Sequence, residues 1–206
     1  MWFSTRCPNR SATLALVLSI GLGVPALAGA ADTQAGEPVS TGTQPNTPVA
    51  VHPQLAGSRL CGQATLRFLG FRIYTARLWA APDCRADQIL ERPAVLELTY
   101  LRDFKASAIA ERSVQEMRRS GGFSDAQAQR WQLEMQRVFP DIKAGDRLTG
   151  HHLQGKGASF WHNGQAVGQV ADADFARQFF GIWLAPTTSQ PAMRLTLLGL
   201  SEQAKP

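Results

Sequence analysis

The 206-residue sequence has only three cysteines and two tyrosines, and it has no long apolar run beyond its first thirty residues. It contains no G-x-S-x-G elbow, phosphate-binding loop, dinucleotide fingerprint or H-E-x-x-H pattern. The cysteines show neither C-x-x-C spacing nor a neighbouring histidine, so they do not indicate a metal site. The sequence therefore predicts no metal, no cofactor and no catalytic residue of these classes.

Clustered charge is also scarce. The formal net charge is +5 at pH 7, and the Lys and Arg residues are spread singly among acidic residues. Without a basic stripe, nucleic acid is not an expected partner. The only histidine cluster is His151-His152 with His162, and neighbours on a strand point to opposite faces. We expect solvated strand histidines there rather than a metal site.

The N-terminus has the pattern of a secretory signal peptide over residues 1–30. Arg6 and Arg10 precede an apolar run over 12–28, and small residues follow it. Cleavage near Ala28 or Ala30 would make the protein periplasmic or secreted. The alternative is a retained anchor, but the glycines and the proline in the run make it a poor membrane span.

The rest of the chain divides by composition. Residues 31–54 have almost no large apolar side chain, which predicts a flexible leader because such a segment cannot bury enough surface to offset its ordering entropy. A folded domain is expected over 55–200, with a short tail over 201–206. No segment of the mature chain reaches the length of a membrane span.

The stretch from Cys61 to Cys84 predicts a β-hairpin. Apolar and polar residues alternate through 64–68 and again through 71–79, with Leu69-Gly70 between them. Loss of Cys7 with the signal peptide leaves Cys61 and Cys84 as the only thiols in an oxidising compartment, where a lone pair usually forms a disulfide. We expect these two cysteines to face each other across paired strands.

The later elements predict an α+β domain. A strand over 94–101 precedes a helix with Asp103 as its N-cap, and a second helix starts at Ser124 with a capping box completed by Gln127. Three short strands follow at 146–153, 158–162 and 165–170, then helices over 172–183 and from Pro191. This order predicts an antiparallel sheet with helices packed on one face.

Four residues are candidates for ligand binding: Arg67, Arg72, Tyr74 and Tyr100. Alternation places Arg72 and Tyr74 on one face of the second hairpin strand. An arginine on an apolar face either extends its charge to the rim or binds an anion, and an Arg with a Tyr hydroxyl could clamp a carboxylate or phenolate. A bulge near Gly70 would exchange the faces, so the alternation does not decide which arginine faces the interior.

Three motifs resemble one family. They are G-F-R-I-Y-T-A-R-L-W over 70–79, L-T-Y-L-R-D over 98–103 and F-F-G-I-W-L-A-P-T-T-S over 179–189. Together they are similar to the chalcone isomerase-like family, and to its bacterial exported branch in particular. The resemblance implies an open-faced β-sandwich with a ligand cleft between sheet and helices.

The resemblance also bears on function. Plant members cyclise chalcones, whereas related plant members bind fatty acids through an Arg and a Tyr, and Arg67 is the nearest match to that arginine. True isomerases carry a Tyr and then an Asn on the helix after the central strand, and residues 103–120 contain neither. We therefore expect an exported, non-catalytic binder of a small apolar or amphipathic, fatty-acid-like ligand. The alternatives are an isomerase acting on a chalcone-like or other conjugated substrate, and a cleft closed by bulky residues such as Trp79, Trp161 or Phe180, with function at the surface.

Overall fold

A computed structural model describes residues 57–201. The predicted signal peptide, its cleavage site, Cys7, the whole predicted leader and all of the predicted tail except Ser201 lie outside the described residues. Six strands form one antiparallel sheet in chain order, so each strand pairs with its neighbours in sequence. Their bounds are β1 Arg59–Phe68, β2 Phe71–Ala80, β3 Ala94–Tyr100, β4 Arg147–Leu153, β5 Gly157–His162 and β6 Gln165–Val170.

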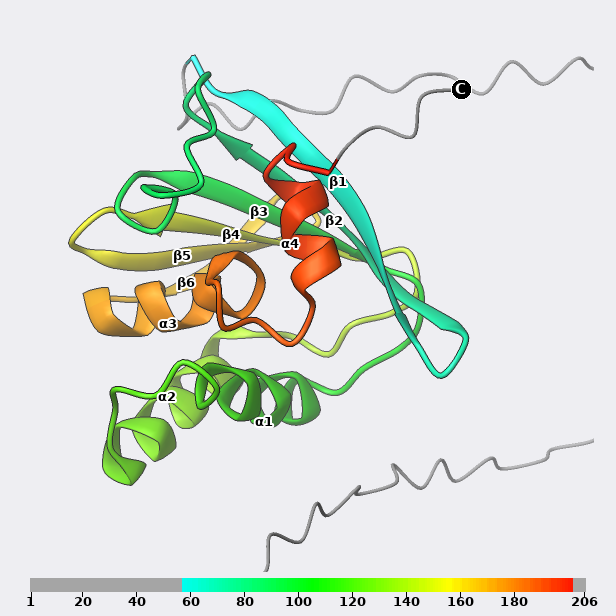
Figure 1. The fold of residues 1–206 in the computed structure, drawn as a ribbon. Coiled ribbons are helices and arrows are strands. Elements are labelled where there is room, and N and C mark those ends of the chain that lie inside the picture. Colours follow the sequence, from blue (N-terminus) through cyan, green and yellow to red (C-terminus); the bar gives the residue numbers. More distant parts are fainter. Residues whose placement is uncertain (1–56, 202–206) are drawn as a thin grey trace, which may run out of the picture. The chain divides into compact units, whose positions relative to one another are not determined.

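Four helices cover one face of this sheet (Figure 1). They are α1 Ala106–Met117, α2 Asp125–Val138, α3 Ala173–Leu184 and α4 Pro191–Leu197. α3 packs on β4 and β5, α4 packs on β1 and β2, and α1 packs mainly on α2 and α3. The predicted α+β class, an antiparallel sheet with helices on one face, is confirmed.

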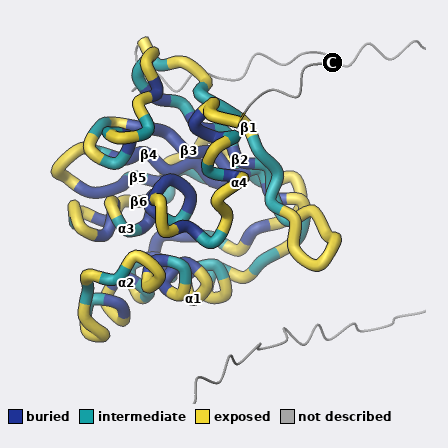
Figure 2. Tube along the Cα trace, viewed as in Figure 1, coloured by how far each residue is buried: buried dark blue, intermediate teal, exposed yellow. Residues whose placement is uncertain are grey.

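The core lies between the sheet and α3 and is rich in aromatic rings. Phe175 and Phe179 stack with ring centroids 5.5 Å apart, and Phe160 and Phe180 each meet Phe179 edge to face. All four side chains are buried, and the buried segments converge on this layer (Figure 2). Close aromatic packing of this kind leaves little free space in the interior.

Several local signals in the sequence define the helix boundaries as expected. Ser124 and Gln127 form the predicted capping box of α2. Asp172 caps α3 by accepting a hydrogen bond from the Phe175 N–H, and Pro191 stands at the start of α4. These signals act within a few residues, which is why they can be found without knowledge of the fold.

The predicted cap of the first helix is wrong. Lys105 precedes α1 and makes no side-chain cap, and the N–H of Ala106 donates instead to Asp141, which is 35 residues away. Asp103 binds the Nζ of Lys143 at 2.8 Å and accepts from the N–H of Ala144. A carboxylate brought in by the tertiary fold thus does the capping that the local sequence assigned to Asp103.

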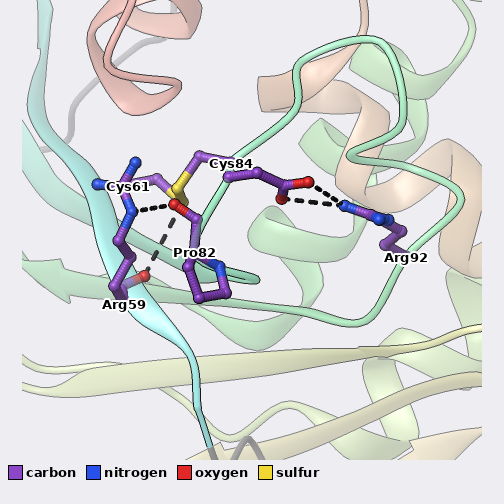
Figure 3. Close-up of a disulfide and its surroundings, with 6 residues drawn as sticks. Arg59, Cys61, Pro82, Cys84 and Arg92 are labelled. Carbon is purple, nitrogen blue, oxygen red and sulfur yellow. Dashed lines mark hydrogen bonds and ion pairs between the residues drawn. A yellow bond between two sulfur atoms is a disulfide. The ribbon is translucent and has the colours of Figure 1, made fainter.

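The predicted disulfide between Cys61 and Cys84 is present (Figure 3). Its position differs from the expectation, because Cys84 lies beyond β2 in the connection to β3 rather than on a strand. Cys61 occupies a register shift in β1, and next to the bridge the Arg59 side chain donates to the Pro82 carbonyl. The disulfide therefore ties an edge strand to a loop.

The predicted hairpin is confirmed, with Leu69 and Gly70 as its turn. A second register shift lies near that turn: Leu66 pairs with Tyr74, whereas Arg67 pairs with Arg72. Paired residues share a face of the sheet, and Leu66 and Arg67 are neighbours on opposite faces. Arg67 and Arg72 therefore lie on the face opposite Tyr74. The expectation that Arg72 and Tyr74 share a face is wrong because of this bulge.

The histidines are less exposed than predicted. His151 and His152 are both buried; His151 stacks on Trp161, and the Nδ1 of His152 lies 2.8 Å from the Arg92 carbonyl. His162 lies 3.0 Å from Asp146. In the described part of the chain, no three His, Cys, Asp or Glu side chains gather as metal ligands.

Candidate functional site

A cluster of polar groups lies where β2 and β3 meet α3. Tyr74 and Tyr100 are partners on these two strands, and their rings meet edge to face with centroids 5.7 Å apart. Trp183 of α3 donates a hydrogen bond from Nε1 to the Tyr74 hydroxyl at 2.9 Å. Trp183 and Tyr100 are buried, and Tyr74 is partly buried. The two tyrosine candidates are thus brought together, with a tryptophan that the sequence did not nominate.

Both tyrosine hydroxyls stay protonated over the physiological range. Burial raises the pKa of Tyr74 to about 12, the Trp183 hydrogen bond opposes this rise, and Glu116 adds to it. Burial also raises the pKa of Tyr100, with a smaller contribution from Tyr74. The cluster therefore offers neutral hydroxyls, which can donate or accept hydrogen bonds but cannot act as bases near neutral pH.

Helix α1 contributes an ion pair beside this cluster. Arg112 and Glu116 are one turn apart and hydrogen-bonded, and both act electrostatically on Tyr74. The Glu116 side chain is only 11% exposed, and its Oε2 makes no hydrogen bond, although the Nε of Arg119 lies 3.9 Å away. A mostly buried carboxylate is thus already bound by an arginine, and both charges act electrostatically on Tyr74.

The space between the sheet and α3, beyond the cluster, is almost filled by side chains. An apolar cavity of about 10 Å³ lies between the sheet and α3, lined by Leu96, Leu98, Leu148, Gly150, Phe160, Phe179, Phe180 and Trp183. A single water needs roughly 10–15 Å³, and pockets for drug-sized ligands are on the order of 300–1,000 Å³. Phe180, one of the residues named as a possible plug, is among those that fill this space.

The two candidate arginines lie elsewhere. Arg67 and Arg72 are paired next to the turn of the β1–β2 hairpin, and both are exposed. The structure does not bring them to the Tyr74 hydroxyl; the arginine that does act on Tyr74 is Arg112. Their assignment to ligand binding stays a prediction from the sequence.

The fold and this cluster can be compared with known proteins. Residues 49–199 match the family model described as chalcone isomerase-like. The chain belongs to the chalcone isomerase-like family. An uncharacterized protein of Haemophilus influenzae is 30% identical over 138 residues, which are 67% of this chain and 66% of that protein. The chain therefore spans slightly less than two thirds of that relative's length.

A solved structure shares the fold. The crystal structure of an Arabidopsis thaliana fatty-acid binding protein superposes with a TM-score of 0.53, covering 71% of this chain and 91% of the plant chain. The two sequences are 14% identical in this alignment, so the likeness concerns the fold alone. The chalcone isomerase-like architecture expected from the three motifs is confirmed.

Two parts of the polar cluster around Tyr74 were not identified from the sequence. Arg112 and Glu116 form an i, i+4 pair on a helix, a spacing that usually marks a solvated surface pair. Trp183 was noted only within the motif over 179–189, although its spacing from Phe179 and Phe180 places the three on one helix face. These residues act together only because α1 and α3 pack close to Tyr74, and no local sequence pattern predicts that packing.

A further missed residue is Glu97, on the sheet face opposite the helices. It is 3% exposed and lies between Arg77 and Arg147, at 3.7 and 3.8 Å. Arg77 also donates to Gln63 at 2.7 Å. Two guanidinium groups here offset the charge of a buried carboxylate, which would be costly if it were left alone.

Proposed function

We propose that this chalcone isomerase-like protein is a non-catalytic binder of a small amphipathic ligand, such as a fatty acid, held between the sheet and the helices. The proposal rests on the hydrogen bond from Trp183 to Tyr74. Through this hydrogen bond, the indole that lines the apolar cavity also contacts the polar cluster. An apolar interior with a few convergent polar groups is the usual form of a site for such a ligand. The shared fold with a fatty-acid binding protein supports the ligand class.

Arg112 is the group best placed to hold a ligand carboxylate. It already binds one carboxylate, that of Glu116, and its charge acts electrostatically on Tyr74. A ligand carboxylate would take the place of Glu116 on the guanidinium and accept a hydrogen bond from Tyr74. Glu116 thus acts as an internal competitor for the same site.

The ligand tail requires the interior to open. The cavity of about 10 Å³ cannot hold an acyl chain, and its wall on the α3 side is formed by Phe179, Phe180 and Trp183. α1 rests mainly on α2 and α3 rather than on a strand, so its displacement breaks few contacts with the sheet. Movement of Trp183 away from Tyr74 would join the cavity to the polar cluster.

Isothermal titration of the delipidated protein with palmitate tests this function. We expect saturable binding of one ligand, weakened about tenfold or more by Arg112→Gln, because a charged hydrogen bond is lost. Glu116→Gln should tighten binding by removing the competing carboxylate. Arg137→Gln, which breaks a similar Arg–Glu pair on α2, is the matched control and should change nothing. Equal binding by all four proteins would contradict the placement of the head group.

The filled interior favours a second candidate function, in which the cavity is structural and the protein acts through its surface. Native mass spectrometry of the protein purified from its own cells separates the two. A stoichiometric amphiphile in the organic extract would support the ligand-binding function. An empty protein that takes up no added fatty acid would favour the surface function.

Catalysis and export complete the proposal. We infer that isomerase activity on a chalcone-like substrate is absent, because α1 presents Arg112 and Glu116 and no Tyr or Asn; turnover of chalcones by the purified protein would overturn this.

We also infer export to the periplasm or the medium, with cleavage near Ala28 or Ala30. N-terminal sequencing of the protein from its host tests the cleavage. Among the described residues, no helix is long and apolar enough to cross a membrane.

A further inference from the structure

The turn of the β1–β2 hairpin carries an exposed apolar group that the proposed ligand site does not use. We call Phe68, Leu69, Gly70 and Phe71 the hairpin tip. The exposed fractions are 55% for Phe68, 81% for Leu69 and 58% for Phe71. The hairpin extends past the neighbouring strands, and its end is exposed (Figures 1 and 2). Three large apolar side chains therefore stand together at a projecting end of the described domain.

Three arginines surround the hairpin tip. Arg67 and Arg72 pair across the hairpin next to it, and the Arg102 guanidinium lies 4.6 Å from the centre of the Phe71 ring. None of these three has a carboxylate or carbonyl partner among the described residues, whereas every other described arginine has one. Asp103 follows Arg102 in the chain, but Lys143 neutralises it. The tip is thus ringed by uncompensated positive charge.

The backbone conformation at Leu69 makes a leucine unusual at this position of the turn. Leu69 has φ +48° and Gly70 has φ +81°, so both central residues of the turn adopt the left-handed region. Asn or Gly occupies the first of these positions at lower cost, as Asn163 does in the turn between β5 and β6. Leu69 accepts this strain while 81% of its surface stays exposed, so folding alone does not explain it.

We propose that the hairpin tip docks the protein on an anionic lipid bilayer, with its three apolar side chains in the interface and the arginines at the head groups. Apolar side chains in the acyl boundary with basic residues beside them are the arrangement of an interfacial anchor. The ring of unpaired arginines favours an anionic surface over a neutral one. The narrow projecting end suits insertion better than a protein interface, which needs a broad patch. This docking does not depend on a ligand in the interior.

Co-sedimentation with vesicles tests the docking. We would use the full chain in the form that its host produces, with phosphatidylcholine vesicles that contain or lack phosphatidylglycerol. Binding should require phosphatidylglycerol and weaken as salt is raised, because exposed charges are screened. Each of Arg67→Gln, Arg72→Gln and Arg102→Gln should weaken it about fivefold. Arg130→Gln, which breaks an ion pair at α2, is the charge-matched control and should have no effect.

Leu69→Asn separates docking from folding. The substitution suits the left-handed backbone, so the melting temperature should stay the same or rise, while vesicle binding should fall about tenfold with the loss of one apolar anchor. All variants share one N-terminus, so differences between them report on the tip. Leu133→Asn, which replaces another exposed leucine on α2, is the matched control and should bind vesicles like the parent.

Two outcomes would overturn the proposal. One is equal binding of the parent and Leu69→Asn, which would show that the tip does not meet the bilayer. The other is failure of the parent to bind phosphatidylglycerol vesicles at low salt. In the second case, capture of a protein partner that Leu69→Asn abolishes would identify a protein, and not a bilayer, as the occupant of the tip.

Discussion

At the scale of single residues, Tyr74 joins the apolar interior to the polar cluster. Its hydroxyl accepts from the indole of Trp183, and its ring packs against Tyr100. A buried indole N–H without an acceptor costs about 1–3 kcal/mol. The position therefore requires an acceptor for stability as well as for any ligand.

Tyr74→Phe removes that acceptor and should lower the free energy of unfolding by about 1–2 kcal/mol at pH 7. Urea unfolding followed by circular dichroism measures the change. Tyr100→Phe is the control: the Tyr100 hydroxyl makes no hydrogen bond with a described residue, so its loss should cost less. A Tyr74→Phe protein as stable as its parent would mean that the Trp183–Tyr74 hydrogen bond contributes nothing.

The raised pKa of Tyr74 adds a pH dependence. The folded protein keeps this proton to about pH 12, whereas an unfolded tyrosine releases it near pH 10. The folded state then binds more protons than the unfolded state in this window, so stability is full below pH 10 and falls as the pH rises toward 12. In Tyr74→Phe this fall should be shallower between pH 10 and 12, measured by urea unfolding at several pH values. An unchanged slope would place the alkaline transition at other groups.

At the scale of elements, the start of α3 is fixed by one side chain. Oδ1 of Asp172 accepts from the Phe175 N–H at 3.0 Å, and Oδ2 accepts from the indole of buried Trp131 at 2.9 Å. Arg130 binds the same Oδ2 at 2.6 Å. Asp172 therefore links α3, which forms one wall of the cavity, to α2.

Asp172→Ala should lower the free energy of unfolding by about 2–3 kcal/mol, because the helix loses its cap and the Trp131 N–H loses its acceptor. Asp174→Ala, in the first turn of the same helix and exposed, should cost little and serves as the control. Urea unfolding of both variants gives the comparison. Equal losses would show that helix-end charge, and not the specific contacts of Asp172, stabilises the start of α3.

An element could be predicted from the sequence when the residues that define its ends lie close together in the chain. The Ser124 capping box and the Leu69-Gly70 turn are local, and both were found from the sequence. The cap of α1 comes from Asp141, far away in the chain, and Asp103 was chosen because only local residues could be considered. The bulge in the hairpin has no sequence mark, so the faces of Arg67 and Arg72 could not be derived.

At the scale of the whole molecule, periodicity and resemblance were enough for the sheet order and the helical layer, since strand alternation and short turns leave few topologies. They were not enough for the site. The convergence of Arg112, Glu116 and Trp183 on Tyr74 depends on how α1 and α3 settle on the sheet, which is a packing result. The small cavity is equally a result of side-chain packing, because the same apolar pattern could surround an open or a closed interior.

The disulfide stabilises the edge of this sheet where the C-terminal helix closes the fold. It joins β1 to the loop after β2, and at Gly62, next to Cys61, α4 approaches so closely that a Cβ would lie 2.1 Å from the Thr196 carbonyl. Reduction of the disulfide should lower the free energy of unfolding by roughly 3 kcal/mol, because the bridge joins two cysteines that are 23 residues apart in the chain. Hydrogen exchange should then rise in β1 and α4 and change little in β3 and β4, which are paired on both sides. A uniform rise would instead show that the bridge stabilises the domain as one cooperative unit, and free thiols in the unreduced protein would show that the bridge does not form.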